Sequence, residues 1–235
     1  LLCYAILSNK LNVVKEILSV YEKDRTMMLA WKVTQNVISV AWPQGVSCLI
    51  FAMSFASSDI VTTLLESGAD IHSTDNMGCD AFMHACQFGR LENIKTWFSK
   101  NSNWNVNRTS TKYGITALQM AVYLGPKKID MVRYLVEKLN VSITTLTKSG
   151  MSALILACSN EDANPKVIEY LLERKVNINL QIVSQTAKWK VMRAAARFVV
   201  RFKMSRSRLV RKIAENSGLT ALHYAVRRGD MDIVE

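Results

Sequence analysis

Apolar and polar positions along the chain alternate in a way that predicts pairs of short amphipathic helices. In each first stretch an apolar residue is followed three positions later by alanine, and these pairs are Leu49/Ala52, Phe82/Ala85, Leu118/Ala121, Leu154/Ala157 and Leu222/Ala225. Residues three apart share one face of a helix, and the small alanine lets a neighbouring helix approach closely. A second amphipathic stretch follows, as at residues 59–65 and 166–172. The pattern therefore predicts antiparallel helix pairs.

Glycines mark the turns between these stretches. Five of the nine stand four residues before the apolar position, at Gly45, Gly78, Gly114, Gly150 and Gly218, and their spacings are 33, 36, 36 and 68 residues. The last spacing is close to two periods. Glycine is favoured where the backbone must adopt positive φ, so its fixed positions indicate turns at fixed positions. A period of this size predicts a solenoid.

The second residue after each of these glycines has a side chain that can cap a helix. The residues are Ser47, Asp80, Thr116, Ser152 and Thr220. Such side chains accept a hydrogen bond from the free N–H groups of a first helical turn. Each first helix is therefore predicted to begin directly after this position.

Together these positions strongly resemble the ankyrin repeat, whose signature is G-x-T-P-L-H-x-A. Residues 68–78 also resemble the β-hairpin finger of that family. The signature proline is replaced throughout, by Cys48, Ala81, Ala117, Ala153 and Ala221, and the signature histidine remains only as His223. Alanine is a good helix former, so losing the proline weakens the resemblance little. The resemblance implies an all-α solenoid of helix-turn-helix units with β-hairpin-like fingers, which recognises other proteins and binds no cofactor.

The repeats are predicted to form one domain across residues 1–235. Their expected boundaries are about 1–24, 45–77, 78–113, 114–149, 150–181 and 215–235, with insertions at about 25–44 and 182–214. Neither end has the polar capping repeat that a solenoid needs for solubility, so a fragment of a longer protein is expected. The insertion 25–44 is too apolar for a free loop. Packing over the neighbouring finger is the preferred interpretation, with an exposed partner patch as the alternative.

Cysteine, histidine and motif content argue against chemistry in this chain. Five cysteines without a C-x-x-C pair favour a reducing, cytoplasmic location, with the nucleus as a further option. His72, His84 and His223 occupy repeat positions and have no metal-ligand spacing. No phosphate-binding, dinucleotide-binding or nucleophile-elbow motif is present. The sequence therefore predicts a protein that is not an enzyme and binds neither cofactor nor metal.

The insertion 182–214 holds almost all of the net charge of +11, because it contains ten Lys and Arg residues and no acidic one. It has no glycine or proline and is predicted to be a single helix. One stripe is basic and the other apolar. The residues singled out are Lys190, Arg193, Arg197, Arg201, Arg208 and Arg211, with Trp189, Phe198 and Phe202. A basic amphipathic helix is typical of segments that bind calmodulin or an anionic membrane surface.

Other interpretations of this insertion remain open. Three alternatives are a degenerate repeat, a helix packed back on the solenoid, and a segment that is disordered until a partner arrives. Direct nucleic-acid binding ranks below a protein or membrane partner, because the positive charge is confined to one segment rather than spread along a groove.

The family resemblance implies that a partner lies across the fingers and the exposed face of the first helices. Carried onto this chain, the candidate residues are His72, Asp75 and Asn76 in a finger, with Phe55, Phe88, Tyr123, Leu124, Arg227 and Arg228 at the ends of first helices. Phe55, Phe88, Tyr123 and Leu124 are expected to form an apolar-aromatic strip across three repeats, with core packing as the competing role. Two functions follow: a protein-binding scaffold, or a regulatory module that works through the basic insertion.

Overall fold

The computed structural model describes residues 1–21, 24–30, 32–33, 45–123, 129–160, 164–202, 204, 207–216 and 218–229. The chain divides into two compact units, and each is described by itself. The first contains Leu1–Lys112 and Thr116–Pro126, and the second contains Tyr113–Ile115 and Lys127–Glu235. The single domain expected across residues 1–235 stays a prediction.

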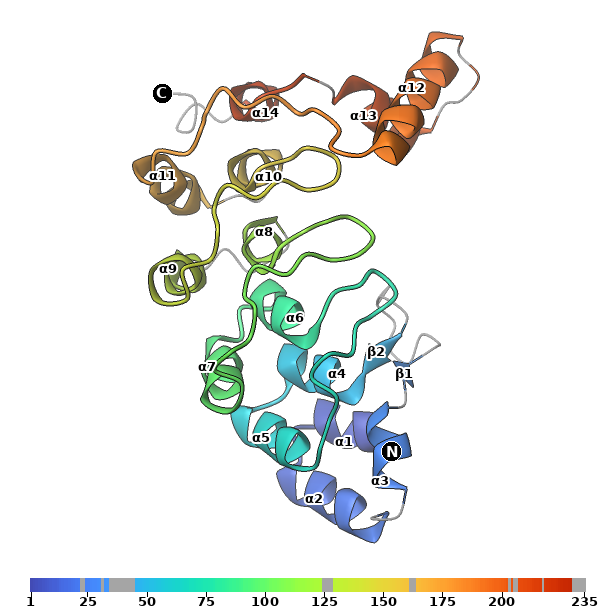
Figure 1. The fold of residues 1–235 in the computed structure, drawn as a ribbon, viewed down its shortest axis with the longest axis vertical. Helices are drawn as coiled ribbons and strands as arrows, with labels where there is room; N and C mark the ends of the chain where they lie inside the picture. The colour runs from blue at the N-terminus through green and yellow to red at the C-terminus, as the bar shows by residue number, and fades with distance from the viewer. Residues whose placement is uncertain are drawn as a thin grey trace. The chain divides into compact units, whose positions relative to one another are not determined.

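The first unit is built from helix pairs stacked in two rows (Figure 1). First helices α1, α4, α6 and α8 contact one another in sequence, and second helices α2, α5 and α7 do the same beside them. The bounds are α1 Leu2–Leu7, α2 Leu11–Val20, α4 Cys48–Phe55, α5 Ser58–Glu66, α6 Ala81–Gln87, α7 Leu91–Lys100 and α8 Ala117–Tyr123.

The second unit repeats this arrangement and adds two helices. First helices α10 and α14 pack together, α11 packs on both α10 and α9, and α12 packs on α13. The bounds are α9 Ile129–Arg133, the π-helix η1 Tyr134–Lys138, α10 Ala153–Ser159, α11 Pro165–Glu173, α12 Ala187–Arg201, α13 Arg208–Glu215 and α14 Ala221–Arg228.

The first helices begin where the capping residues predict. Ser47, Asp80, Thr116 and Ser152 each accept a hydrogen bond from the backbone N–H three residues on, at 2.9 to 3.3 Å. At Thr220 the backbone N–H donates to His223 Nδ1 at 3.2 Å. All five turn glycines before these caps have φ between 65° and 90°. The predicted cap and turn chemistry is therefore confirmed.

Apolar side chains from both rows of helices fill the core. The predicted Leu or Phe of each first helix is buried in α4, α6, α8 and α10, and so is the alanine that follows it. In α14 the alanine Ala225 is buried while Leu222 is 55% exposed. The first unit is also filled by the side chains of Trp97, Ile60 and Ile94, which belong to second helices. No single helix pair could form such a core, which is why repeats of this kind are stable only when stacked.

One extra residue explains the π-helix. The chain turns out of α5 at Gly68, four residues after the buried Leu64, but turns out of η1 at Asn140, five residues after the buried Leu135. The hydrogen bond that closes each helix end spans one more residue in η1. After α5 it runs from Ala69 N–H to the Leu64 carbonyl, and after η1 it runs from Val141 N–H to the Leu135 carbonyl. A π turn absorbs the added residue without moving the helix ends.

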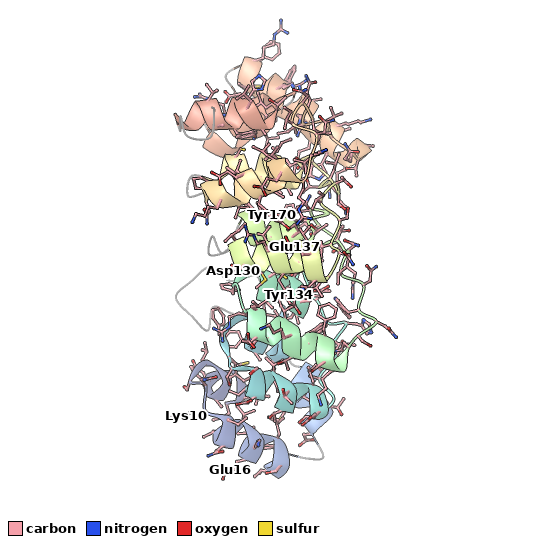
Figure 2. All side chains as sticks on the ribbon, turned by 90° about the vertical axis from the view of Figure 1, so that its left-hand side faces the viewer. Lys10, Glu16, Asp130, Tyr134, Glu137 and Tyr170 are labelled. Carbon is pink, nitrogen blue, oxygen red and sulfur yellow. The ribbon has the colours of Figure 1, made fainter. Side chains whose placement is uncertain are left out.

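The second helices of the second unit are linked by polar contacts (Figure 2). Glu137 Oε1 accepts hydrogen bonds from Tyr170 Oη at 3.0 Å and from Arg174 Nη2 at 2.6 Å. The Arg174 guanidinium also lies 4.9 Å from the centre of the Tyr170 ring. Burial, together with the bond to Glu137, raises the pKa of the Tyr170 hydroxyl. These contacts fix η1 against α11.

The described part of the first insertion packs back on the repeats. Helix α3 spans Arg25–Ala30, and its Leu29 is buried. Strand β1, Lys32–Val33, pairs antiparallel with β2, Val46–Ser47, just before α4. This agrees with the preferred interpretation of packing, while the other apolar residues of this insertion, Trp31 and residues 34–44, lie outside the described residues.

The fold is an all-α ankyrin-type solenoid of helix-turn-helix units, as expected. Within the described ranges the only strands are β1 and β2, and none of the helices there has the length and apolar character needed to cross a membrane.

Candidate partner-binding surfaces

Fingers connect each repeat to the next and follow one hydrogen-bonding pattern. In the finger before α6, Asp75 N–H donates to the Cys79 carbonyl and Gly78 N–H donates to the Asp75 carbonyl, both at 3.0 Å. Thr147 makes the same pair of bonds with Met151 and Gly150 before α10. Positive φ and space both require glycine here, because a Cβ on Gly78 would collide with Thr111 of the next finger.

Asp75 was predicted to face a partner, but its side chain points inward. Oδ1 accepts from the backbone N–H groups of Met77 and Cys79, both at 2.8 Å, and Oδ2 accepts from His84 Nε2 at 3.0 Å. Both side chains are almost completely buried. Burial raises the pKa of the Asp75 carboxyl, but the bonds from His84 and the backbone outweigh it, and the pKa is lowered overall. Asp75 thus fixes the finger to α6.

His72 of this finger contacts an aromatic and cationic group in the segment that follows α7. The ring of His72 stacks on Trp104 at 5.4 Å, and the Arg108 guanidinium lies 4.8 Å from the centre of the same indole. Arg108 Nε is also 3.7 Å from Asp80 Oδ2. His72 and Asn76 are exposed, whereas Trp104 is buried. His72 and Asn76 are therefore accessible to a partner.

Two members of the predicted aromatic strip, Phe55 and Phe88, contact each other in the first unit. The ring centres of Phe55 and Phe88 are 5.0 Å apart, and Phe55 also contacts Phe51 at 5.3 Å. Phe55, Phe88 and Tyr123 lie at the ends of α4, α6 and α8 and are half-buried. Their half-burial is compatible with both packing against the repeats and contact with a partner. Leu124, the fourth predicted member, lies outside the described residues.

At the end of the second unit, Arg227 is exposed on α14 and its Nη2 lies 3.8 Å from Glu215 Oε2. Arg228 also belongs to α14, but its side chain lies outside the described part of the chain.

The basic insertion replaces the tip of a finger. Ile182 N–H donates to the Leu219 carbonyl and Gly218 N–H donates to the Ile182 carbonyl, both at 3.0 Å. These are the same two bonds that Asp75 and Thr147 make in their fingers. Only two residues separate Thr147 from Gly150, whereas residues 183–217 separate Ile182 from Gly218. The repeat therefore closes normally around its insertion.

The inserted segment is two helices instead of the single helix predicted. Helix α12 ends at Arg201, and α13 starts at Arg208 and packs against it. The pair lies on the finger side of the second unit, away from α11 (Figure 1). No glycine or proline marks the break, but Ser207 stands directly before α13 and is of the residue type that favours a helix start. Packing of the two apolar faces against each other provides the physical reason.

Arg193 was predicted to be part of an exposed basic stripe, but it is only 7% exposed. Its Nη2 donates to the Ser149 carbonyl at 3.2 Å, and its Nη1 lies 3.5 Å from the Ile182 carbonyl. Burial, with the nearby Arg197 charge, lowers the pKa of its guanidinium. In the neighbouring finger, the Lys148 N–H fills the same role toward the Tyr113 carbonyl. Arg193 therefore anchors α12 on the adjacent finger tip.

The remaining residues of α12 separate into two faces. Ala196 is buried, and Trp189, seven residues before it on the same side of the helix, is half-buried. The opposite face is exposed and carries Lys190, Val191, Arg197, Phe198, Arg201 and, directly after the helix, Phe202. Arg197 also has its Nε 3.5 Å from the Ala214 carbonyl of α13. In α13, Arg211 is exposed, and the Arg208 side chain is not among those described.

All five cysteines are free and buried. Cys3 and Cys48 lie with their sulfurs 3.7 Å apart beside a cavity of about 480 Å³. A hydrogen bond from Cys48 lowers the pKa of the Cys3 thiol, and the same bond together with burial raises that of Cys48. No group of three or more potential metal ligands occurs in the described ranges.

Comparison with known proteins identifies the repeats. A family model described as ankyrin repeats (3 copies) matches residues 1–108 and 82–182, and one described as ankyrin repeat matches residues 217–235. The probable E3 ubiquitin-protein ligase XBOS32 of Oryza sativa subsp. japonica is 38% identical over 79 residues. The E3 ubiquitin-protein ligase XBAT33 of Arabidopsis thaliana is also 38% identical over 79 residues. Each match covers 34% of this chain, and 16% and 15% of those proteins respectively.

A solved structure shares the fold over nearly the whole chain. It is the predatory endopeptidase Bd0816 from Bdellovibrio bacteriovorus in complex with the immunity protein Bd3460. The likeness has a TM-score of 0.63 at 16% identity, and covers 99% of this chain and 94% of the matched one. The family models cover well over half of the sequence, and the chain belongs to the ankyrin-repeat family.

Proposed function

We propose that the chain is a non-catalytic scaffold or adaptor that binds a partner protein across its fingers and first-helix ends. Ankyrin repeats are protein-interaction modules, and the repeats span most of this chain. The single observation that carries the proposal is the contact between Phe55 and Phe88 of successive first helices. Both rings are half-buried, and the finger before α6 exposes His72 and Asn76. Clustered aromatic side chains are favoured anchors in protein interfaces.

The ligase activity in the names of the plant relatives is not part of this proposal. The chain spans about one sixth of the length of the curated relatives it matches. A match of that extent supports a shared repeat module. It gives no reason to assign the activity of the longer proteins to this chain.

Site-specific crosslinking tests the binding surface directly. A photo-reactive amino acid placed at Asn76, which is exposed in the finger, is expected to crosslink the partner. The same group at Ser99, which is exposed on the second helix α7, is the matched control and is expected to give none. Equal crosslinking from both positions, or crosslinking from Ser99 alone, would contradict the proposed surface.

Alanine substitutions test the aromatic strip. Phe88→Ala with Tyr123→Ala is expected to weaken binding of the crosslinked partner at least about tenfold, because aromatic anchors carry a large share of interface energy. Phe98→Ala removes a ring of the same kind that is half-buried on α7 and serves as control. A double variant that remains folded and binds like the parent would remove the strip from the interface.

A second candidate function is favoured by the exposed face of α12. In this alternative the chain is a regulatory module whose basic insertion, residues 182–214, binds calmodulin or an anionic membrane surface. Val191, Phe198 and Phe202 are exposed beside basic side chains, a combination typical of such segments. Replacing residues 183–217 with a short turn, which leaves the closing bonds of Ile182 in place, separates the two functions. Binding through fingers and first helices should survive, and binding through the insertion should be lost.

A further inference from the structure

The outward face of α12 carries a line of apolar side chains. Val191, Phe198 and Phe202 are seven and four residues apart, so they lie on one side of the helix. They are 68%, 56% and 58% exposed, and the two phenyl rings touch with their centres 4.5 Å apart. We call these three residues the α12 ridge. Exposed large apolar side chains that adjoin one another mark an interaction site more often than isolated ones do.

Basic side chains flank the ridge. Lys190, Arg197 and Arg201 each precede a ridge residue by one position, which places them along one side of it, rotated by about 100° around the helix. All three are exposed, and Lys188 is exposed on the other side. Across the described residues no acidic side chain forms an ion pair with any of the four. The sequence 182–214 contains no Asp or Glu, so nothing within the insertion neutralises this face.

The opposite face of α12 is already occupied. Ala196 and Arg193 are each 7% exposed, Arg193 is bonded to the Ser149 carbonyl, and α13 packs alongside. Calmodulin-like proteins bind a helix by laying its apolar face into a groove that encloses it. To be enclosed in this way, α12 would have to leave the finger and α13. A flat surface needs only the face that α12 presents.

We propose that the α12 ridge and its basic flank dock the protein on an anionic lipid membrane surface. This rests on the second candidate function and selects between its two ligands. Phe198 and Phe202 would enter the boundary between headgroups and acyl chains, where aromatic side chains are favoured. Lys190, Arg197 and Arg201 would contact the anionic headgroups. Arg193 is a positioning residue, because it holds the helix with the ridge outward.

Vesicle flotation of the whole chain tests this proposal. The protein is expected to float with phosphatidylcholine vesicles that contain phosphatidylserine and to stay in solution with phosphatidylcholine alone. Replacing Lys190, Arg197 and Arg201 with glutamine is expected to weaken binding about a hundredfold, at about fivefold per basic residue. Replacing Phe198 and Phe202 with serine is expected to weaken binding about tenfold or more. Higher salt should weaken binding of the parent.

Matched controls keep the test specific. Leu222 and Val226 are an exposed apolar pair four residues apart on α14, and their replacement with serine should leave vesicle binding unchanged. Lys138, Lys166 and Lys175 are exposed lysines in the second unit, and their change to glutamine removes the same charge without touching α12. Circular dichroism and thermal unfolding establish that each variant folds. Equal losses in test and control variants would overturn the proposal, because they would indicate attraction by net charge alone.

The remaining outcomes are also decisive. If the protein floats with neither type of vesicle, membrane docking is overturned. If it also binds calcium-loaded calmodulin in that case, calmodulin is the ligand. A variant carrying Phe88→Ala and Tyr123→Ala should still float, since those residues lie outside α12. Failure of vesicle binding therefore leaves the crosslinking test at Asn76 untouched, and failure of that test leaves vesicle binding untouched.

Discussion

Two buried aspartates only five residues apart have pKa values shifted in opposite directions, although burial raises the pKa of both. Asp75 receives three hydrogen bonds, from His84 and two backbone N–H groups, and its carboxyl pKa is lowered. Burial dominates at Asp80 and raises its pKa, despite the bond from Met83 N–H and the charge of Arg108. Asp80 also caps α6. At Asp75 the bonds from His84 and the backbone outweigh the effect of burial, and at Asp80 the corresponding bonds and charges do not.

Asp75→Asn is expected to change how stability depends on pH. A carboxyl with a lowered pKa in the folded state stabilises the fold above its ordinary pKa of about 4, and this stability is lost as pH falls further. The parent should therefore exceed the variant by about 1 to 3 kcal/mol at pH 7, with the gap narrowing below about pH 4. Urea unfolding across this range measures the difference.

Asp80→Asn is the matched control for that experiment. Because the Asp80 pKa is raised, ionisation costs stability as pH rises from the ordinary value, so the sign reverses. Asparagine keeps the cap and carries no charge. This variant should equal or exceed the parent at pH 7 and approach it in acid. Parallel pH curves for Asp75→Asn and Asp80→Asn would refute the assignment of opposite shifts.

Lys175 occupies a position at which the chain favours glycine. It follows α11 with φ of 55°, just as Gly68 follows α5 with φ of 86°. A left-handed conformation costs a residue with a Cβ about 1 to 2 kcal/mol. Glycine removes this cost, but its more flexible unfolded state cancels part of the gain in stability. Lys175→Gly is therefore expected to raise the free energy of unfolding by about 0.5 to 1 kcal/mol.

Denaturant unfolding checks this, with Glu169→Gly as control. Glu169 is exposed within α11, where glycine should cost about 1 kcal/mol. A loss of stability in both variants would mean that the backbone at Lys175 is not strained.

At the scale of elements, one buried arginine holds the inserted helix in place. Arg193→Ala leaves the Ser149 carbonyl without its guanidinium partner, and hydrogen bonds to charged groups contribute about 1.5 to 3 kcal/mol. Hydrogen exchange in residues 187–201 is therefore expected to accelerate about tenfold or more, while exchange in α10 stays unchanged. Arg201→Ala, an exposed arginine of the same helix, should have little effect. Unchanged exchange in the Arg193 variant would place the anchoring in apolar packing instead.

Elements that depend on local chemistry could be predicted from the sequence, and those that depend on tertiary contacts could not. Gly78 predicts a turn and Asp80 predicts a helix start, because backbone sterics and capping act within a few residues. The basic stripe containing Arg193 is predicted from the three- and four-residue steps between basic residues, which do not show that Arg193 faces inward. Its spacing from Ala196 and Trp189 was a usable signal, since residues three and four apart share a face. The break between α12 and α13 has no glycine or proline, and Ser207 directly before α13 is a weak local signal for it.

In the candidate site, too, exposure that depends on local position could be predicted and orientation that depends on a tertiary contact could not. Asn76 could be placed on the surface from its finger position, and the structure leaves it exposed. Asp75 is its direct neighbour and turns inward because His84 on α6 offers a buried partner. That pairing joins residues nine positions apart across a turn, and the repeat pattern by itself does not reveal it.

At the scale of the whole molecule, the insertion is a separable addition to a closed repeat. Replacing residues 183–217 with Lys-Ser, the dipeptide that follows Thr147, would restore an ordinary finger between Ile182 and Gly218. The change removes ten basic side chains and Glu215 and adds one lysine, so the net charge falls from +11 to +3. Because the two closing hydrogen bonds need only Ile182, Gly218 and Leu219, the repeats are expected to fold.

The expected result is a protein that loses the helical signal of α12 and α13 and keeps its unfolding temperature within a few degrees. The new lysine N–H replaces Arg193 as donor to the Ser149 carbonyl, as Lys148 N–H does for Tyr113. Circular dichroism and hydrogen exchange of α10 and α14 measure this. Vesicle binding should disappear, and crosslinking from Asn76 should persist. If the shortened chain unfolds, or if its α10 exchanges rapidly, the prediction is wrong. In that case α12 is required for the stability of the unit.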